Sequence, residues 1–314
     1  MPDFDLPLAA LHTYRPEPNA PADLAAFWDR TLAEVRSVPL NVHLERLDYP
    51  ARNADVYRVR FAGWRGLNVG GWYVAPKGKG PWPCLIHYHG YSWHRGGVED
   101  YLAWIVQGYA SLAIDMPGQS PESDDPGGPG TAGMGWMTRG LLDPDVYYYR
   151  AAYATAVRAL DVVAELPGAD PARIGVHGVS QGGGVTLAVA ALDARPLAAM
   201  PEVPYLCHFR RAVEMATKMP YPELANFAKR YPQHEQTMWN TLAYFDNLNL
   251  ADRIKAPTLM SAGLRDECCP PSTIFGVYHR ITAKRELDIF PYAEHDMLPA
   301  HTEKVYRWCL DHLG

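Results

Sequence analysis

A serine enclosed by glycines, at the junction of a strand pattern and a helix pattern, constrains the fold of this chain most. The stretch Gly178-Val179-Ser180-Gln181-Gly182 lies between an apolar run at 173–177 and a helical pattern at 181–192. A turn this tight needs small residues beside the serine, because larger side chains would collide there. The hydroxyl then projects at a helix N-terminus, where amides and the helix dipole favour negative charge. The pattern predicts a nucleophile elbow, although a glycine-rich turn with a spectator serine has the same residues.

Two later loops can supply the base and the carboxylate that such a serine needs. Asp266 follows a buried strand pattern at 257–263, and His295 follows a short strand pattern at 287–290. Both residues therefore fall at the carboxyl ends of successive strands, on the edge where open α/β sheets place their sites. The chain order serine, acid, histidine is that of α/β hydrolases. We expect Ser180, Asp266 and His295 to form a catalytic triad; a solvated carboxylate and a surface histidine are the alternative interpretation.

Acyl transfer by such a triad also needs two amides that hold the oxyanion. One is the amide that follows the nucleophile, here that of Gln181, and the other comes from the loop after an earlier strand. Residues 84–88 have a strand pattern and run into His89-Gly90-Tyr91. We therefore expect the amide of Tyr91 to be the second donor.

Neither the histidines nor the cysteines predict a metal centre or a disulfide framework. His87 and His89 alternate along the strand pattern, but no third ligand follows at a convincing spacing. The five cysteines (84, 207, 268, 269 and 309) are an odd number without framework spacing. Cys268 and Cys269 are adjacent, which would suit a redox pair, but structural thiols in a reducing cytoplasm are the favoured interpretation. We expect no metal and no cofactor.

Composition favours one large globular enzyme domain. A chain of 314 residues with 48% apolar residues can fill the core of a single α/β domain. A net charge of −6 and a pI near 6.0 argue against a nucleic-acid partner. The N-terminus lacks a signal-peptide pattern and no apolar run reaches the length of a membrane span. We expect a cytoplasmic protein that acts on a small molecule.

The order of patterns predicts an α/β-hydrolase fold of residues 1–314, with a mostly parallel sheet, antiparallel N-terminal strands and helices on both faces. The other predicted elements are a helix at 24–35, strands at 44–49, 56–62, 67–74 and 110–115, and a helix at 144–166. Asp143 would cap that last helix, with Pro144 in its first turn. Its tyrosines, 147 to 149, are expected at the surface or in an interface.

Two segments interrupt the alternation of strands and helices. Residues 119–139 are rich in Gly, Pro and Asp and are too long for an ordinary connection, so they are expected to be functional or to make contacts. Residues 204–251 hold short helical patterns and many aromatic residues. This second segment falls between two core strands, so we expect it to pack over the catalytic edge as a helical cap.

Several longer motifs occur nearly from end to end of the chain. One of them, Cys207-His208-Phe209-Arg210-Arg211, is far more specific than the elbow pattern alone. The others are Tyr14-Arg15-Pro16, Phe27-Trp28, Gly71-Trp72, His89-Gly90-Tyr91, Met137-Thr138-Arg139-Gly140, Leu142-Asp143-Pro144, Tyr147-Tyr148-Tyr149-Arg150, Gly178 to Gly184, Tyr244-Phe245-Asp246 and Cys269-Pro270-Pro271-Ser272-Thr273. Together these motifs resemble carbohydrate esterase family seven, the acetyl xylan esterases and cephalosporin C deacetylases.

The resemblance implies deacetylation of small acetylated sugars and related acetate esters without a cofactor. It implies a homo-oligomer, a hexamer built as a trimer of dimers, with 119–139 as the interface extension. By position it gives the same triad and the same two amide donors, and it implies that bulky aromatics such as Tyr91 crowd the acyl pocket. The chain departs from the family at Pro117, where Arg is usual, and at Asp296, where Glu is usual; we hypothesise that the two changes are related.

Two other functions share these features. The same fold carries peptidases and hydrolases of lactones or thioesters, so a hydrolase of another class is the main alternative. A catalytically silent scaffold on a hydrolase fold is the second, and the complete Ser, Asp and His set argues against it.

Overall fold

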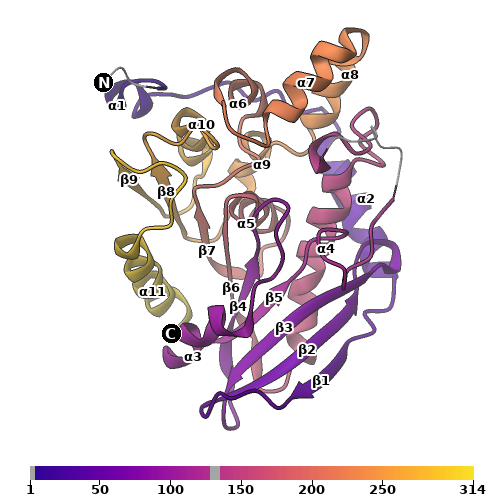
Figure 1. Cartoon of the computed structure of the whole chain (residues 1–314), viewed down its shortest axis with the longest axis vertical. Coiled ribbons are helices and arrows are strands. Elements are labelled where there is room, and N and C mark those ends of the chain that lie inside the picture. Colours follow the sequence, from indigo (N-terminus) through magenta and orange to yellow (C-terminus); the bar gives the residue numbers. More distant parts are fainter. Residues whose placement is uncertain (1–3, 128–134) are drawn as a thin grey trace.

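The computed structural model describes residues 4–127 and 135–314, whose strands form one continuous sheet (Figure 1). The strands are β1 (His43–Leu47), β2 (Ala54–Ala62), β3 (Asn68–Pro76), β4 (Trp82–Tyr88), β5 (Ala110–Ile114), β6 (Ala169–Val179), β7 (Pro196–Glu202), β8 (Thr258–Gly263) and β9 (Arg285–Phe290). The helices are α1 (Leu8–Leu11), α2 (Leu24–Ser37), α3 (Leu102–Val106), α4 (Tyr148–Val162), α5 (Gln181–Leu192), α6 (Phe209–Met215), α7 (Pro222–Arg230), α8 (Glu235–Leu242), α9 (Asn247–Leu250), α10 (Pro271–Arg280) and α11 (Pro299–Leu313).

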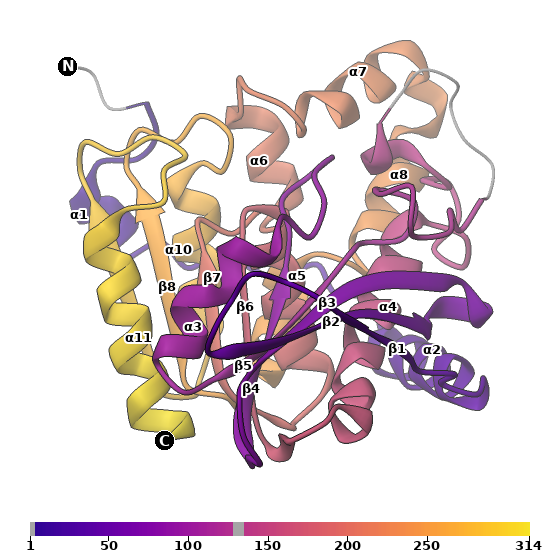
Figure 2. The ribbon, with the colours of Figure 1, turned by 60° about the horizontal axis from the view of Figure 1, so that its bottom comes forward.

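The sheet is mixed, and its parallel part carries the predicted site. In the described residues its nine strands follow the order β1-β2-β3-β5-β4-β6-β7-β8-β9. The pairs β1–β2, β2–β3 and β3–β5 are antiparallel, and all pairs from β5 to β9 are parallel. The predicted α/β fold with antiparallel N-terminal strands is therefore confirmed. Figure 2 shows the antiparallel strands crossing in front of the parallel ones.

Burial explains why the parallel strands read as apolar runs. Every residue of β5 and of β8 is buried, because helices cover both faces of the sheet there. Helices α4 and α5 pack together on one face, with α2 outside α4, and α3 and α11 pack on the other. On the first face Trp28 stacks on Tyr153 with ring centroids 5.8 Å apart. On the second face the core includes Trp104 and Trp308.

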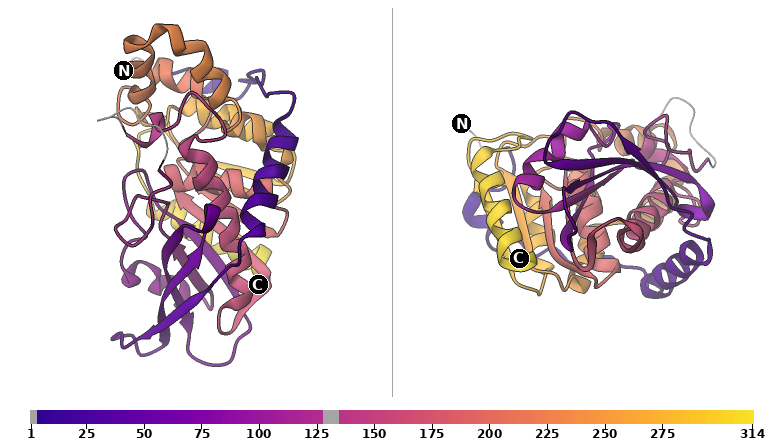
Figure 3. Two further views of the ribbon diagram at one scale, coloured as in Figure 1. Left: turned by 90° about the vertical axis from the view of Figure 1, so that its right-hand side faces the viewer. Right: turned by 90° about the horizontal axis from the view of Figure 1, so that it is seen from below.

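Residues 204–251 form helices α6 to α9, which follow directly after β7. In Figures 1 and 3 the helices α6, α7 and α8 lie at the end of the molecule opposite β1. The buried carboxylate of Asp246 joins two of these helices, because it accepts hydrogen bonds from the amides of His208 (2.7 Å), Phe209 (2.8 Å) and Leu248 (2.9 Å). The start of α6 and the start of α9 are thereby held at one point.

Three expectations from the sequence need correction. Helix α4 begins at Tyr148 instead of Pro144, because residues 143–147 form turns in which Asp143 accepts from the amide of Asp145 (2.9 Å). Tyr147, Tyr148 and Tyr149 are buried and pack in the core, so they are not surface residues. The third correction is β7, which the sequence pattern did not predict; prolines at both of its ends, Pro196 and Pro201, obscure it.

The predicted extension at 119–139 lies partly outside the described residues, which omit 128–134. On its described flanks Arg139 forms an ion pair with Asp125 (2.7 Å) and its guanidinium lies 4.5 Å from the ring centroid of Trp136. Within this segment Asp124 accepts from the amide of Asn68 (2.8 Å) at the start of β3. The described flanks are therefore fastened to the antiparallel strands and to each other.

Candidate active site

Ser180 occupies the sharp turn between β6 and α5. Its backbone is in an unusual conformation, with φ 58° and ψ −117°. The turn is held from two sides: the Ser180 amide donates to the carbonyl of Glu202 (3.0 Å), and the Ser180 carbonyl accepts from the amides of Tyr205 (2.9 Å) and Gly184 (3.0 Å). A strained residue persists where its surroundings over-determine it, which is frequent at functional sites.

The glycines around Ser180 allow neighbouring backbones to approach closely. A Cβ on Gly182 would lie 1.9 Å from the carbonyl oxygen of Tyr88, at the end of β4. A Cβ on Gly178 would lie 2.5 Å from the carbonyl oxygen of Gly182. Both separations are impossible for real atoms, so the turn and the loop after β4 can be this close only with glycine at these positions.

Asp266 and His295 come together in the loops after β8 and β9. His295 Nδ1 lies 2.7 Å from Asp266 Oδ2. The other oxygen, Asp266 Oδ1, accepts hydrogen bonds from the amides of Cys268 (2.8 Å) and Cys269 (2.7 Å). Asp266 is fully buried, whereas the His295 side chain is 28% exposed. The carboxylate is therefore fixed by its own loop and orients an imidazole that solvent can reach.

The pKa of His295 reflects this partner. Burial lowers the pKa of the imidazole, but the hydrogen bond and the charge of Asp266 outweigh it, and the negative charges of Cys268 and Asp296 add to them, so the pKa lies above 6.5. In the neutral ring Nδ1 must carry the proton, because it donates to a carboxylate. The lone pair is then on Nε2, where it is free of the hydrogen bond to Asp266.

The topology brings Ser180 to the same sheet edge as this pair. Strands β6, β7, β8 and β9 are parallel neighbours in that order, and all three predicted residues follow the carboxyl ends of their strands. A direct hydrogen bond from the serine hydroxyl to the imidazole is not formed between these described residues. Such contacts are often long in unliganded enzymes and tighten with substrate.

The two predicted amide donors lie on segments that touch. Tyr91 is in the loop after β4, and Gln181 begins α5. The side-chain amide of Gln181 lies 3.4 Å from the carbonyl oxygen of Gly90, next to Tyr91. Among the described residues, the backbone amides of Tyr91 and Gln181 donate no hydrogen bond to another loop, strand or helix. Both amides are therefore available to a ligand.

The side chain of Gln181 connects three parts of the site, which the sequence did not indicate. Its Oε1 accepts from Gln119 Nε2 (3.0 Å) and from the hydroxyl of Tyr149 (3.0 Å). Gln119 Oε1 in turn accepts from the amide of Ser92 (3.0 Å), in the loop of Tyr91. Gln119 follows the Pro117-Gly118 pair and Tyr149 lies in a family motif, so both positions stood out in the sequence. Neither position indicated a contact with Gln181.

The side chain of Tyr91 is anchored to helix α7, within residues 204–251. Its hydroxyl donates to Glu223 Oε1 (2.7 Å) on α7 and accepts from the amide of Met137 (3.2 Å). Its ring packs edge to face on Tyr205, with centroids 6.1 Å apart. Burial, and then Glu223, raise the pKa of the Tyr91 hydroxyl, and burial raises the pKa of Glu223. Glu223 is a second residue near the site that the sequence did not indicate.

The alternating histidines have structural partners. His87 Nδ1 lies 3.1 Å from His177 Nδ1, and His87 Nε2 lies 3.2 Å from the hydroxyl of Ser111. His89 Nε2 accepts from the amide of Met116 (2.8 Å) and burial lowers the pKa of His89 to about 4. A neutral His89 therefore supports the loop that carries Tyr91.

The two departures from the family have separate surroundings. The carbonyl of Pro117 accepts from the hydroxyl of Tyr148 (2.9 Å). Asp296 accepts from the amide of Glu294 (2.9 Å) and so closes the loop of His295. Across the described residues no hydrogen bond or ion pair joins position 117 to position 296. Their hypothesised relation stays a prediction.

This sheet, the turn at Ser180 and the buried acid on a histidine define an α/β hydrolase. Residues 1–312 match the acetyl xylan esterase family (AXE1), and the chain belongs to that family. The acetyl xylan esterase from Paenibacillus sp. R4 has a TM-score of 0.95 with 42% identity, over 98% of this chain and 100% of that one. That from Thermoanaerobacterium sp. JW/SL YS485 has a TM-score of 0.93 with 34% identity, over 98% of this chain and 99% of that one.

A longer relative and a more distant structure complete the comparison. Acetyl esterase Axe7A of Xylanibacter ruminicola is 30% identical over 293 residues, which are 90% of this chain, and the chain spans 65% of that protein's length. The α/β hydrolase GrgF from Penicillium sp. sh18, at 20% identity and a TM-score of 0.61, shares the fold alone. Among the described residues, no helix is long and apolar enough to span a membrane.

The contact between Gly182 and Tyr88 makes a testable prediction. Replacing Gly182 with Ala places a methyl group against backbone that cannot move aside, so the free energy of unfolding should fall by about 1–3 kcal/mol or more. The measurement is urea unfolding. Gly90→Ala is the matched control, because a Cβ at position 90 meets no atom within 4 Å. Equal losses in both variants would contradict the steric explanation.

Proposed function

We propose that this protein is a serine esterase that removes acetyl groups from small acetylated sugars, such as xylo-oligosaccharides, and from related acetate esters such as cephalosporin C. The observation that carries the proposal is the 2.7 Å hydrogen bond between His295 and the buried Asp266, at the same sheet edge as Ser180. Membership of the acetyl xylan esterase family and the names of the similar proteins support the choice of an acetyl ester.

In the first step His295 Nε2 accepts the proton of the Ser180 hydroxyl as the oxygen attacks the acetyl carbonyl. Asp266 holds the ring in the required tautomer and stabilises the imidazolium that forms. The amides of Tyr91 and Gln181 hold the negative charge that develops on the carbonyl oxygen. The imidazolium then gives its proton to the departing sugar hydroxyl, which leaves an acetyl group on Ser180.

In the second step water replaces the alcohol. His295 takes a proton from water, the resulting hydroxide attacks the acetyl carbonyl of the acyl-enzyme, and the same amides hold the oxyanion. Collapse of the intermediate returns the proton to Ser180 and releases acetate. The proposed chemistry uses no group beyond these side chains and amides.

We propose that Tyr91 keeps the acyl pocket small, as the family resemblance implies, and the firm hold on its side chain supports this role. Its ring is fixed by Tyr205 on one side, and its hydroxyl by Glu223 and Met137 on the other. A fixed aromatic ring beside the oxyanion donors leaves space for a methyl group more readily than for a long acyl chain. We propose that residues 204–251 serve as the cap that completes this pocket.

The assembly and the location of the enzyme are proposed on separate grounds. Large apolar side chains are exposed on loops near the site: Trp93 is 62% exposed, Tyr292 80% and Met297 66%. Such exposure favours contacts with further copies of the chain, as in the hexamer that the family resemblance implies, with 119–139 as interface extension. Light scattering should then give a mass six times that of the chain, and a monomeric mass would overturn this assembly.

All five cysteines are unpaired, which supports a cytoplasmic location.

Substrate choice tests the proposal directly. Acetyl nitrophenyl ester, acetylated xylose and cephalosporin C should release acetate, with rates that fall steeply from acetyl to butyryl to octanoyl nitrophenyl esters. Ser180→Ala should lower kcat by about 10⁴-fold or more. Serine-dependent cleavage of longer esters, peptides, lactones or thioesters without deacetylation would instead indicate another hydrolase class, and no serine-dependent activity would indicate a silent scaffold.

The pH dependence tests the role of the Asp266–His295 pair. The base works only when unprotonated, and the pKa of His295 is raised, so kcat/KM should rise with pH through a midpoint above 6.5. Asp266→Asn removes the charge that raises this pKa, so the midpoint should move to lower pH while kcat falls by about 10⁴-fold. Asp296→Asn is the control, because it removes a weaker influence on the same ring. An unchanged midpoint in Asp266→Asn would contradict the assignment.

A further inference from the structure

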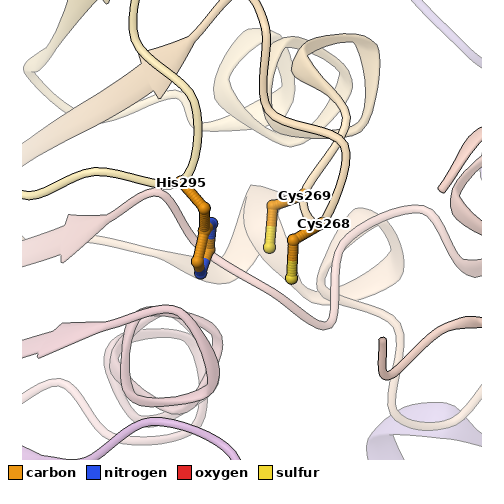
Figure 4. A group of neighbouring side chains, drawn as sticks. All are labelled: Cys268, Cys269 and His295. Carbon is orange, nitrogen blue, oxygen red and sulfur yellow. The ribbon is translucent and has the colours of Figure 1, made fainter. Parts of the chain in front are cut away.

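Two thiols lie beside the proposed base, as Figure 4 shows. Cys268 and Cys269 follow Asp266 in the loop after β8, and His295 is in the loop after β9. The two sulfur atoms and a ring nitrogen of His295 all lie within 4.8 Å of one another. In Figure 4 the side chains of both cysteines lie on one side of the imidazole ring of His295.

This set of atoms suits a soft divalent cation. Thiolate and imidazole are the ligands that Zn²⁺ prefers, at about 2.3 Å for sulfur and about 2.0–2.1 Å for nitrogen. A tetrahedral ion at those distances keeps its ligand atoms about 3.5–3.8 Å apart. The present separations exceed that range by at most about 1 Å, which small side-chain rotations can close. Hard cations such as Mg²⁺ prefer oxygen ligands and do not fit this set.

We propose that Cys268, Cys269 and His295 form an inhibitory binding site for Zn²⁺ and its soft relative Cd²⁺. Three protein ligands leave one position of a tetrahedral ion for water. The ion is an inhibitor here and takes no part in the reaction. Access is through the exposed side of the His295 ring, since the two cysteines themselves are buried.

Metal binding and catalysis exclude each other because they use the same ring. An ion on Nε2 takes the lone pair that would accept the proton of Ser180. An ion on Nδ1 displaces the hydrogen bond to Asp266 and releases the ring from its orientation. The inhibition therefore rests on the proposed function, whereas the binding of the ion does not.

The surroundings shift the pKa values of the two thiols in opposite directions. The hydrogen bond from Cys269 lowers the pKa of Cys268, and the charges of His295 and Lys218 lower it further against burial and the charge of Asp266. Burial raises the pKa of Cys269. Because thiolates are the metal ligands, binding of an ion releases the proton of any thiol that carries one. The ion must also replace the contact of Cys268 Sγ with the carbonyl of Met219 (3.1 Å).

The binding test needs no substrate. Adding Cd²⁺ to the reduced protein should give the ultraviolet absorption of cadmium–thiolate bonds, saturating at one ion per chain. Cys268→Ala and Cys268→Ser should each weaken binding by at least about tenfold, since loss of a supporting residue of a metal ligand already costs that much. His295→Ala should weaken it as well. Cys309→Ala removes a buried thiol outside the cluster and should leave the titration unchanged.

The inhibition test compares, for each protein, the rate of ester hydrolysis with and without zinc. Buffered free Zn²⁺ should inhibit ester hydrolysis by the natural protein and by Cys309→Ala at the same concentration, and a chelator should restore the rate. Cys268→Ser should need at least about tenfold more zinc. Equal zinc sensitivity of all three proteins, or no saturable cadmium absorption, would overturn the site. Saturable cadmium binding in a protein without Ser180-dependent esterase activity would instead leave the metal site standing and overturn the proposed function.

Discussion

The buried carboxylate of Asp266 is the group on which the site depends. One of its oxygens accepts two amides of its own loop, and the other accepts His295 at 2.7 Å. Burial of a charge without partners is costly, and here every partner is a hydrogen-bond donor. The loop after β8 and the loop after β9 are therefore joined through one side chain. The backbone amides of Cys268 and Cys269 fix the carboxylate that orients the ring of His295.

The parallel sheet makes this joining possible. Because β6 to β9 run in the same direction, the serine, the acid and the histidine leave their strands at one edge, although 115 residues separate the first from the last in the chain. The turn at Ser180 adds a second requirement, since the loop after β4 must touch it. Glycine at 182 lets the carbonyl of Tyr88 approach, which brings Tyr91 and Gln181 to the same place.

Local patterns in the sequence predicted much of this arrangement because the relevant signals are local. The helix at 181–192 and the strands that precede Asp266 and His295 follow from periodicity and from the glycines. The predicted start of α4 was wrong because Asp143 and Pro144 form a turn of their own. Tyr149 was expected at the surface or in an interface because its partner Gln181 is distant in sequence. The contact of Glu223 with Tyr91 could not be predicted for the same reason: it joins helix α7 to the loop after β4, and no short motif contains both residues.

The residues that hold Asp266 also make the site sensitive to soft metal ions, if the proposed metal site is correct. Asp266 is held by the amides of Cys268 and Cys269, so the residues that fix the acid also bring two sulfur atoms within 4.8 Å of the base. The amides of any two residues would hold the carboxylate equally well, so the thiols are not needed for that task. The thiols add affinity for soft cations beside the imidazole of His295, which must stay free of metal to accept a proton. The loop after β8 therefore has two effects: its backbone amides fix Asp266, and its side chains supply two of the three proposed metal ligands.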